Sequence, residues 1–214
     1  AQTYKDIEYI IVDGASTDGS RQLIAAEPCV SRWVSEPDRG IYDAMNKGVG
    51  MATGDWVIFM NAGDTFHSPD TLAQVAAQIE PTDDVVYGAV VKADKDGKPM
   101  VKAALPMRNS HRMLFCHQSA LARRELLLQI PFDIRHKYSA DFLFFKTAYK
   151  QGKRFHRLDM PIADFDTSGV SNRRRSAGLA DNISVILQSD GLLKGLPHLL
   201  HLLPTYIIAR MRNK

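Results

Sequence analysis

Short apolar runs that end in turn residues alternate with segments of helical periodicity along the first hundred residues. The apolar runs are Ile7–Val12, Asp55–Met60 and Val85–Lys92, and such nearly continuous runs are typical of strands buried on both faces of a sheet. Apolar residues recur at helical spacing in Arg21–Glu27 and Ile41–Val49. The alternation predicts an α/β domain with a mostly parallel central sheet flanked by helices.

The second half of the chain has a more mixed pattern. The predicted elements there are a hairpin strand over Met100–Ala103, a helix over Asp141–Tyr149, a strand over Lys153–Leu158 and a mostly helical segment from Ser184 onward. Pro197 and Pro204 are expected to interrupt that last segment, because proline lacks the N–H group that a helix interior needs.

Composition and charge narrow the class of protein. The chain has 214 residues, 45% of them hydrophobic and 24% charged, which suits one globular domain with an appendage. Residues 173–214 carry a net charge of +5 and residues 1–172 a net charge of −2. We therefore predict a domain over 1–172 and a basic helical extension over 173–214. The slightly acidic body argues against a nucleic-acid-binding face.

Other features bear on the location of the protein. Cys29 and Cys116 lack CxxC spacing, which supports neither a disulfide framework nor a zinc ribbon and favours a reducing compartment. No run of 18 uninterrupted apolar residues and no signal-peptide pattern is present. The predicted location is cytoplasmic, or the inner face of the cell membrane if the basic extension binds it.

Two carboxylates follow predicted strands at the edge where α/β sheets bind ligands. Asp13 ends the first apolar run and Asp64 follows the second. Asp13 could accept hydrogen bonds from a nucleobase or ribose, and Asp64 could hold a divalent ion against a diphosphate, although either could simply cap its turn. No GxGxxG, P-loop, HExxH or GxSxG motif occurs, which disfavours dinucleotide-dependent redox enzymes, P-loop enzymes and the common hydrolases.

Four sequence blocks resemble family 2 glycosyltransferases of GT-A fold, and bacterial enzymes of the colanic acid type in particular. They are YIIVDGASTDGS (Tyr9–Ser20), SEPDRGIYDAMNKGVGMATGDWVIFMNAGDTF (Ser35–Phe66), HQSALARR (His117–Arg124) and SADFLFFKTAYKQGKRF (Ser139–Phe155). The resemblance implies an inverting enzyme of bacterial surface polysaccharide synthesis. Such an enzyme moves a sugar from a nucleotide-diphosphate donor to a hydroxyl of a glycan or lipid-linked acceptor.

The family pattern assigns roles to individual residues. The residues expected at the nucleotide-sugar donor are Asp13, Ser16, Asp38, Asp43, Asn46, Lys47 and Asn61. Asp64 is expected to hold Mg²⁺ or Mn²⁺, because Asn61-Ala62-Gly63-Asp64 stands where the family has its DxD motif. Asn and Gly replace the usual Asp there, so a single carboxylate remains in the motif. Lys47 could equally be a solvated helix residue.

Asp141 matches the general base of the family, which deprotonates the acceptor hydroxyl as it attacks the anomeric carbon. A carboxylate at a helix start is also favoured by the macrodipole alone. His117, Gln118, Gly169 and Ser171 match positions near the acceptor or over the donor phosphates. A buried, hydrogen-bonded histidine is an equal alternative for His117.

Two rival functions remain open on the sequence. A nucleotidyltransferase would share the α/β sheet, metal and carboxylates, although no Gly-rich basic phosphate loop is present. The other rival is a truncated, non-catalytic nucleotide-binding chain. Family members begin with a strand and helix of about thirty residues ahead of the AQTYKDIEYIIVDG stretch. The resemblance thus predicts an N-terminally short domain that is less stable and less active than a longer one.

The basic extension predicts a surface partner. Its leucines and isoleucines between Leu192 and Ile208 can form an apolar face, and Lys194, Arg210, Arg212 and Lys214 supply cations. This pattern indicates peripheral contact with an anionic membrane. A helix packed on its own domain explains the apolar residues equally well.

Overall fold

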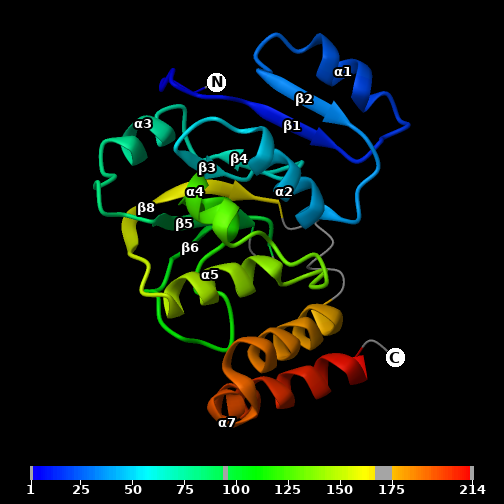
Figure 1. Ribbon diagram of the computed structural model, residues 1–214, viewed down its shortest axis with the longest axis vertical. Coiled ribbons are helices and arrows are strands. Elements are labelled where there is room, and N and C mark those ends of the chain that lie inside the picture. The colour runs from blue at the N-terminus through cyan, green and yellow to red at the C-terminus, as the bar shows by residue number, and fades with distance from the viewer. Residues whose placement is uncertain (1, 94–95, 167–174, 213–214) are drawn as a thin grey trace.

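The computed structural model describes residues 2–93, 96–166 and 175–212, and it shows an α/β fold with two sheets (Figure 1). The strands are β1 (Ile10–Asp13), β2 (Arg32–Ser35), β3 (Trp56–Ile58), β4 (Thr65–Phe66), β5 (Val85–Ala93), β6 (Pro99–Lys102), β7 (Ala120–Arg123) and β8 (Phe155–Phe165). The helices are α1 (Ser20–Ala26), α2 (Ile41–Met51), α3 (Thr71–Ala76), α4 (Arg124–Gln129), α5 (Ala140–Lys150) and α7 (Arg175–Arg212), with a short 3₁₀ turn at His117–Ser119. The predicted fold class is confirmed.

The prediction of a mostly parallel sheet is wrong for the described strands. β1 and β2 form a parallel pair of their own, and the larger sheet has the order β3-β7-β5-β8-β4, with β6 beside β5. In that sheet only β5 and β8 pair in parallel. β7 lies antiparallel between β3 and β5, so those two strands run in the same direction without being neighbours. The sequence pattern did not reveal β7, because its four residues, ALAR, include none of the β-branched or aromatic residues that are typical of strands.

The amphipathic helices α2 and α5 pack their apolar faces into one core. Tyr42, Met45 and Val49 of α2 are buried, at the helical spacing that the sequence shows. On α5, Phe144 and Phe145 belong to the same buried cluster. The shared core holds α2 and α5 against each other, and the start of α5 lies close to α2.

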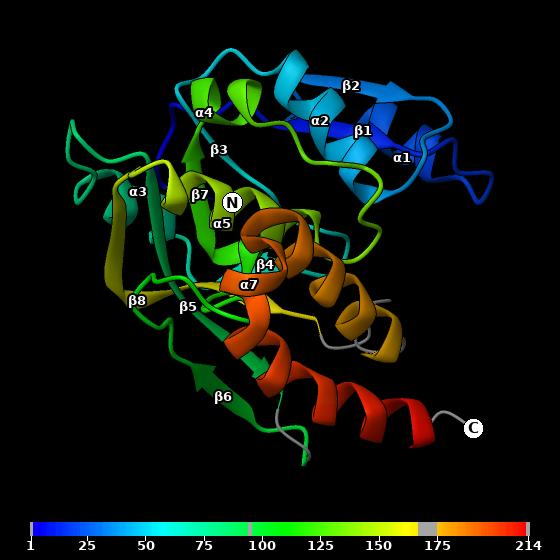
Figure 2. The same ribbon diagram turned by 60° about the horizontal axis from the view of Figure 1, so that its bottom comes forward.

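α7 folds back on itself and covers α5. Phe142 of α5 packs with Val185 and Ile186 from the first segment of α7 and with Leu199 and Leu202 from the second. Figure 1 shows α7 on the opposite side of α5 from α2, and Figure 2 shows its last segment at the edge of the molecule. The border expected at 172/173 lies outside the described residues.

The break within α7 differs from the expected one. Gly191 has non-helical angles (φ 70°, ψ 177°), whereas Pro197 and Pro204 both lie inside the helical segment that follows it. Glycine lacks a Cβ and adopts a positive φ without steric cost, so the chain turns there. No helix in the described part of the chain combines the length and apolar character of a membrane-spanning segment.

Candidate active site

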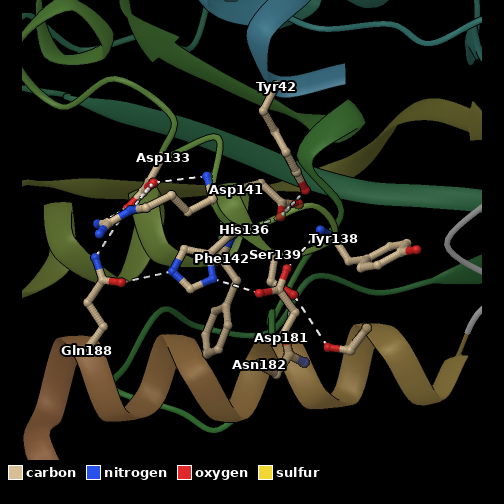
Figure 3. Close-up of polar contacts among 12 residues, drawn as sticks. Tyr42, Asp133, His136, Tyr138, Ser139, Asp141, Phe142, Asp181, Asn182 and Gln188 are labelled. Atoms are coloured by element: carbon tan, nitrogen blue, oxygen red, sulfur yellow. Dashed lines mark hydrogen bonds and ion pairs between the residues drawn. The ribbon is translucent and has the colours of Figure 1, made fainter. Parts of the chain in front are cut away.

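Asp141 in the first turn of α5 is the buried carboxylate at the centre of the site. Its side chain is 13% exposed. Oδ1 accepts hydrogen bonds from the Tyr42 hydroxyl and the Phe142 backbone N–H, both at 2.8 Å, and Tyr42 reaches it from α2 (Figure 3). Burial acts to raise the pKa of Asp141, but hydrogen bonds from His117 and Tyr42 hold that pKa below its ordinary value. The carboxylate is therefore charged at neutral pH.

His117 connects Asp141 to the loop after β3. Its Nδ1 lies 3.1 Å from Asp141 Oδ2, and its Nε2 lies 3.3 Å from the Asn61 amide nitrogen. Because that amide donates to Nε2, the network assigns the imidazole proton to Nδ1, from which it is donated to Asp141. The side chain of His117 is 16% exposed. This is a partly buried, hydrogen-bonded histidine that also touches the proposed base.

Asp64 is the carboxylate of the turn at Asn61–Asp64. Oδ2 accepts from the Gln118 amide at 3.1 Å, and Oδ1 accepts from the Asp166 backbone N–H at 2.9 Å. Gln118 is only 3% exposed. Gly63 has a φ of 97°, and a Cβ there would stand 2.6 Å from Asp166 Oδ2. The Asp166 carboxylate therefore lies against the Asp64 turn, at the end of β8.

These oxygens fit a hard divalent cation. Carboxylates are the oxygen ligands that Mg²⁺ and Mn²⁺ prefer, and one or two of them suffice when substrate phosphates complete the shell. Within the three described ranges, no three His, Cys, Asp or Glu side chains gather so that they could hold a metal ion by themselves. Asp64, with Asp166 beside it, thus suits an ion that is bound together with a phosphorylated ligand.

Asp13 ends β1 in a polar turn. Its carboxylate is buried and accepts from the Ser16 backbone N–H at 3.0 Å, the Ser16 hydroxyl and the Ser35 hydroxyl at 2.7 Å. The hydrogen bonds from Ser16 and then Ser35 lower the pKa of Asp13. A Cβ on Gly14 would stand 2.7 Å from Asp38 Oδ2. Asp13, Ser16 and Asp38 therefore share the edge at which β1 and β2 end.

The polar residues of α2 each have protein partners. The Asn46 amide forms two hydrogen bonds with the backbone of Phe132, at 2.8 and 2.9 Å. Lys47 pairs with Glu36 at 2.8 Å, and Asp43 accepts from the Arg39 backbone N–H at 3.0 Å. These bonds tie α2 to the loop before it and to the loop that contains Phe132. Among described residues, no hydrogen bond joins Asp43 or Lys47 to Asp141 or His117.

The structure thus brings together five of the predicted site residues, namely Asn61, Asp64, His117, Gln118 and Asp141, and places Asp13, Ser16 and Asp38 at a neighbouring edge. Gly169 and Ser171 lie outside the described residues. Sequence reasoning missed Tyr42, which occupies an apolar helix position, and gave Asp166 no role of its own. Tyr42 stands in the IYDAMNKG stretch of the second block, so the signal was present but assigned to its polar neighbours.

Comparison with known proteins identifies the family. The profile of "Glycosyl transferase family 2" matches residues 1–152. A PGL/p-HBAD biosynthesis glycosyltransferase of Mycobacterium bovis is 39% identical over 155 residues, covering 67% of this chain and 58% of the relative. The amylovoran biosynthesis glycosyltransferase AmsB of Erwinia amylovora is 27% identical and covers 77% and 61%. The chain therefore spans little more than half the length of the first of these relatives.

Solved structures agree on the fold. S. aureus TarS 1-349 in complex with UDP-GlcNAc superposes with a TM-score of 0.64 at 19% identity, covering 96% of this chain and 64% of TarS. The mannosyltransferase PcManGT of Pyrobaculum calidifontis, in complex with GDP-Man and Mn²⁺, has a TM-score of 0.65 at 21% identity and covers 94% and 61%. The expected GT-A-like architecture is confirmed. With a profile match over residues 1–152, this chain belongs to glycosyl transferase family 2.

Proposed function

We propose that this chain is an inverting glycosyltransferase that moves a sugar from a nucleotide-diphosphate donor to a hydroxyl of a glycan or lipid-linked acceptor. The observation that carries the proposal is the buried, charged Asp141, joined through His117 and Asn61 to the turn that bears Asp64. The complexes of TarS with UDP-GlcNAc and of PcManGT with GDP-Man support a nucleotide-sugar donor. AmsB supports an acceptor in cell-surface polysaccharide synthesis.

In the proposed reaction, Asp141 accepts the proton of the acceptor hydroxyl as its oxygen attacks the anomeric carbon. The bond to the donor diphosphate breaks on the opposite face, so a single displacement inverts the anomeric configuration. Tyr42 and His117 donate to the two oxygens of Asp141, which keeps the carboxylate ionised and oriented. Such general-base assistance contributes about 10²–10⁴-fold to turnover.

We assign donor binding to the neighbouring edges of the two sheets. Asp13 and Ser16 would contact the nucleobase and ribose, and Asp38, Asp43 and Lys47 would contribute to the same donor site. Asp64, with Asp166, would hold Mg²⁺ or Mn²⁺, which when bound neutralises diphosphate charge. Gln118 and Asn61 orient the Asp64 carboxylate and its turn.

The test is a screen of nucleotide sugars with Mn²⁺ and glycan or lipid-linked acceptors, read by the phosphorus product. Release of nucleoside diphosphate is expected. Release of pyrophosphate instead would identify a nucleotidyltransferase. Tight nucleoside diphosphate binding without turnover for any donor and acceptor pair would favour a non-catalytic binding chain.

We further propose that the second segment of α7 contacts an anionic membrane surface. Leu199 and Leu202 are buried against the domain, yet the same segment also exposes a set of large apolar side chains. The exposed set is Leu192, Leu193, Leu196, Leu200, Leu203, Ile207, Ile208 and Met211. Leu193 is 87% exposed, and contiguous exposed apolar surface is typical of an interaction site.

The cations of α7 flank this apolar face. At roughly 100° per residue, the exposed side chains occupy one side of the helix, with Arg210 at one border and Lys194 at the other. That arrangement is the one adopted by helices lying in the interface of anionic lipid. Lys214, also expected to contribute, lies outside the described residues. The glycan or lipid-linked acceptor of the proposed reaction would be presented at such a surface.

Replacing Leu193 and Leu200 together by Ser should weaken binding to phosphatidylglycerol vesicles by about tenfold or more, because burial of each leucine contributes about 1.5–3 kcal/mol when complete. Vesicle sedimentation measures the loss. Leu23 and Leu128, which are exposed on α1 and α4, make the matched Ser control. Equal partitioning of both double variants would refute the lipid contact, and equal binding to neutral phosphatidylcholine vesicles would refute its preference for an anionic surface.

A further inference from the structure

A buried histidine outside the proposed chemistry joins α7 to the loop ahead of α5. His136 is 3% exposed. Its Nδ1 lies 2.7 Å from Asp181 Oδ1, and its Nε2 lies 2.9 Å from Gln188 Oε1. Figure 3 shows the imidazole between these two side chains, both of which project from the first segment of α7. A buried polar group of this kind is costly unless fully paired.

The partners of Gln188 fix the orientation of its amide group toward His136. The Gln188 amide nitrogen donates to Asp133 Oδ2 at 3.3 Å, so its oxygen is the atom that faces His136. An oxygen thus stands at each ring nitrogen of His136, the Asp181 carboxylate at Nδ1 and the Gln188 amide oxygen at Nε2. Asp133, the other nearby carboxylate, is paired with Arg135 at 2.6 Å.

The same stretch of α7 holds the start of α5. Asp181 Oδ2 accepts from the Tyr138 backbone N–H at 2.8 Å. The Ser139 hydroxyl bonds the Asn182 side-chain oxygen at 2.7 Å. Ser139 is the N-cap of α5, yet its side chain makes no capping bond to the helix. A serine at this position usually caps its own helix, so here α7 takes the place of that local constraint, two residues before Asp141.

We infer that the His136–Asp181 pair is a positioning device through which α7 orients Asp141 toward Tyr42 and His117. Asp181 bonds both the His136 imidazole and the backbone of the loop, which fixes the angle at which α5 begins. The C-terminal helix is thereby part of the machinery of turnover and not only a cover for the core. The inference rests on the proposed role of Asp141 as general base.

Asp181→Asn should lower kcat by about tenfold or more and leave the donor KM within about twofold, since a small misplacement of a reacting group costs up to 10²-fold in rate. Asp141 would also lose part of the hydrogen bonding that lowers its pKa. The pKa of Asp141 should therefore rise. Because Asp141 must be ionised to accept a proton, the acidic limb of the pH profile of kcat should move to higher pH. Asp181→Glu should recover most of the rate.

Asp190→Asn is the matched control, because Asp190 is also a buried α7 carboxylate paired with a cation of the body, Lys146 at 2.8 Å. Its effect should be confined to the free energy of unfolding. If Asp190→Asn does not fold, Lys150→Gln replaces it and breaks only the second, more exposed ion pair of Asp190, which joins it to Lys150 at 3.1 Å. If Asp181→Asn does not fold, His136→Gln replaces it, because that change removes the other member of the His136–Asp181 pair.

The outcomes separate this inference from the proposed function. Equal kcat values and unmoved acidic limbs in the Asp181 and Asp190 variants, with Asp141→Asn inactive, would overturn the positioning role alone. Full activity of Asp141→Asn would instead overturn the proposed function. A loss of kcat with a shifted limb in Asp181→Asn only, at temperatures where both variants are folded, supports the inference.

Discussion

Replacing Asp141 by Asn is expected to lower kcat by about 100-fold or more and to leave donor affinity nearly unchanged. The amide can still accept the hydrogen bond that Tyr42 donates to Oδ1, so the geometry of α5 is retained. It cannot take up the proton of the acceptor hydroxyl, and the missing assistance appears in the transition state only. Single-turnover rates and titration with nucleoside diphosphate measure the two quantities separately.

Asp159→Asn is the control for this experiment, because Asp159 is exposed on β8. It should match the unmodified chain in rate and in affinity. Equal losses of rate and of donor binding in Asp141→Asn would make Asp141 a structural residue. In the unmodified chain, turnover should persist into mildly acidic solution and fall as pH drops through the lowered pKa of Asp141.

Replacing Asp64 by Ala is expected to abolish the Mn²⁺-dependent part of nucleoside diphosphate binding. Asp64 is the only carboxylate of its turn, and the neighbouring Asp166 belongs to another segment whose backbone is itself held by Asp64 Oδ1. Removal of Asp64 therefore takes away both a ligand and the bond that places Asp166. Calorimetric titration with and without Mn²⁺ gives the metal-dependent difference.

The substitution also leaves the buried Gln118 amide without its partner, at a cost of about 1–3 kcal/mol. Asp64→Asn retains an acceptor there and separates loss of metal binding from loss of stability. Asp164→Asn is the control, since Asp164 lies on β8 and pairs with His67 at 2.7 Å. Unchanged Mn²⁺ dependence in both Asp64 variants would show that the metal is held elsewhere.

The local pattern of the sequence determined much about the elements and the ends of the strands. Apolar spacing located α2 and α5 to within about two residues, because burial of one face imposes a period of 3.6 on a helix. Turn residues after apolar runs located Asp13 and Asp64 at strand ends. The four blocks pointed to the family, and the profile match over residues 1–152 confirms it.

Contacts between distant segments were decided by the tertiary structure. Tyr42 and Asp141 are 99 positions apart, and the backbone of Asp166 meets Asp64 across 102 positions. No local period encodes such a pair, because periodicity reports which face of an element is buried and not what covers it. In the sequence, Tyr42 therefore fits the pattern of a core residue. Only the folded chain shows that its hydroxyl meets Asp141 of α5.

The larger sheet and the C-terminal helix also separate what the sequence determined from what only the tertiary structure decided. The sequence determined that β3 and β5 are strands, but the insertion of β7 between them depends on pairing that only the folded chain defines. The apolar residues of α7 indicated a helix with a buried side. That His136 and Ser139 bond this helix, and so hold the start of α5, followed from the tertiary structure alone, since polar side chains pair with whatever acceptors packing brings within reach.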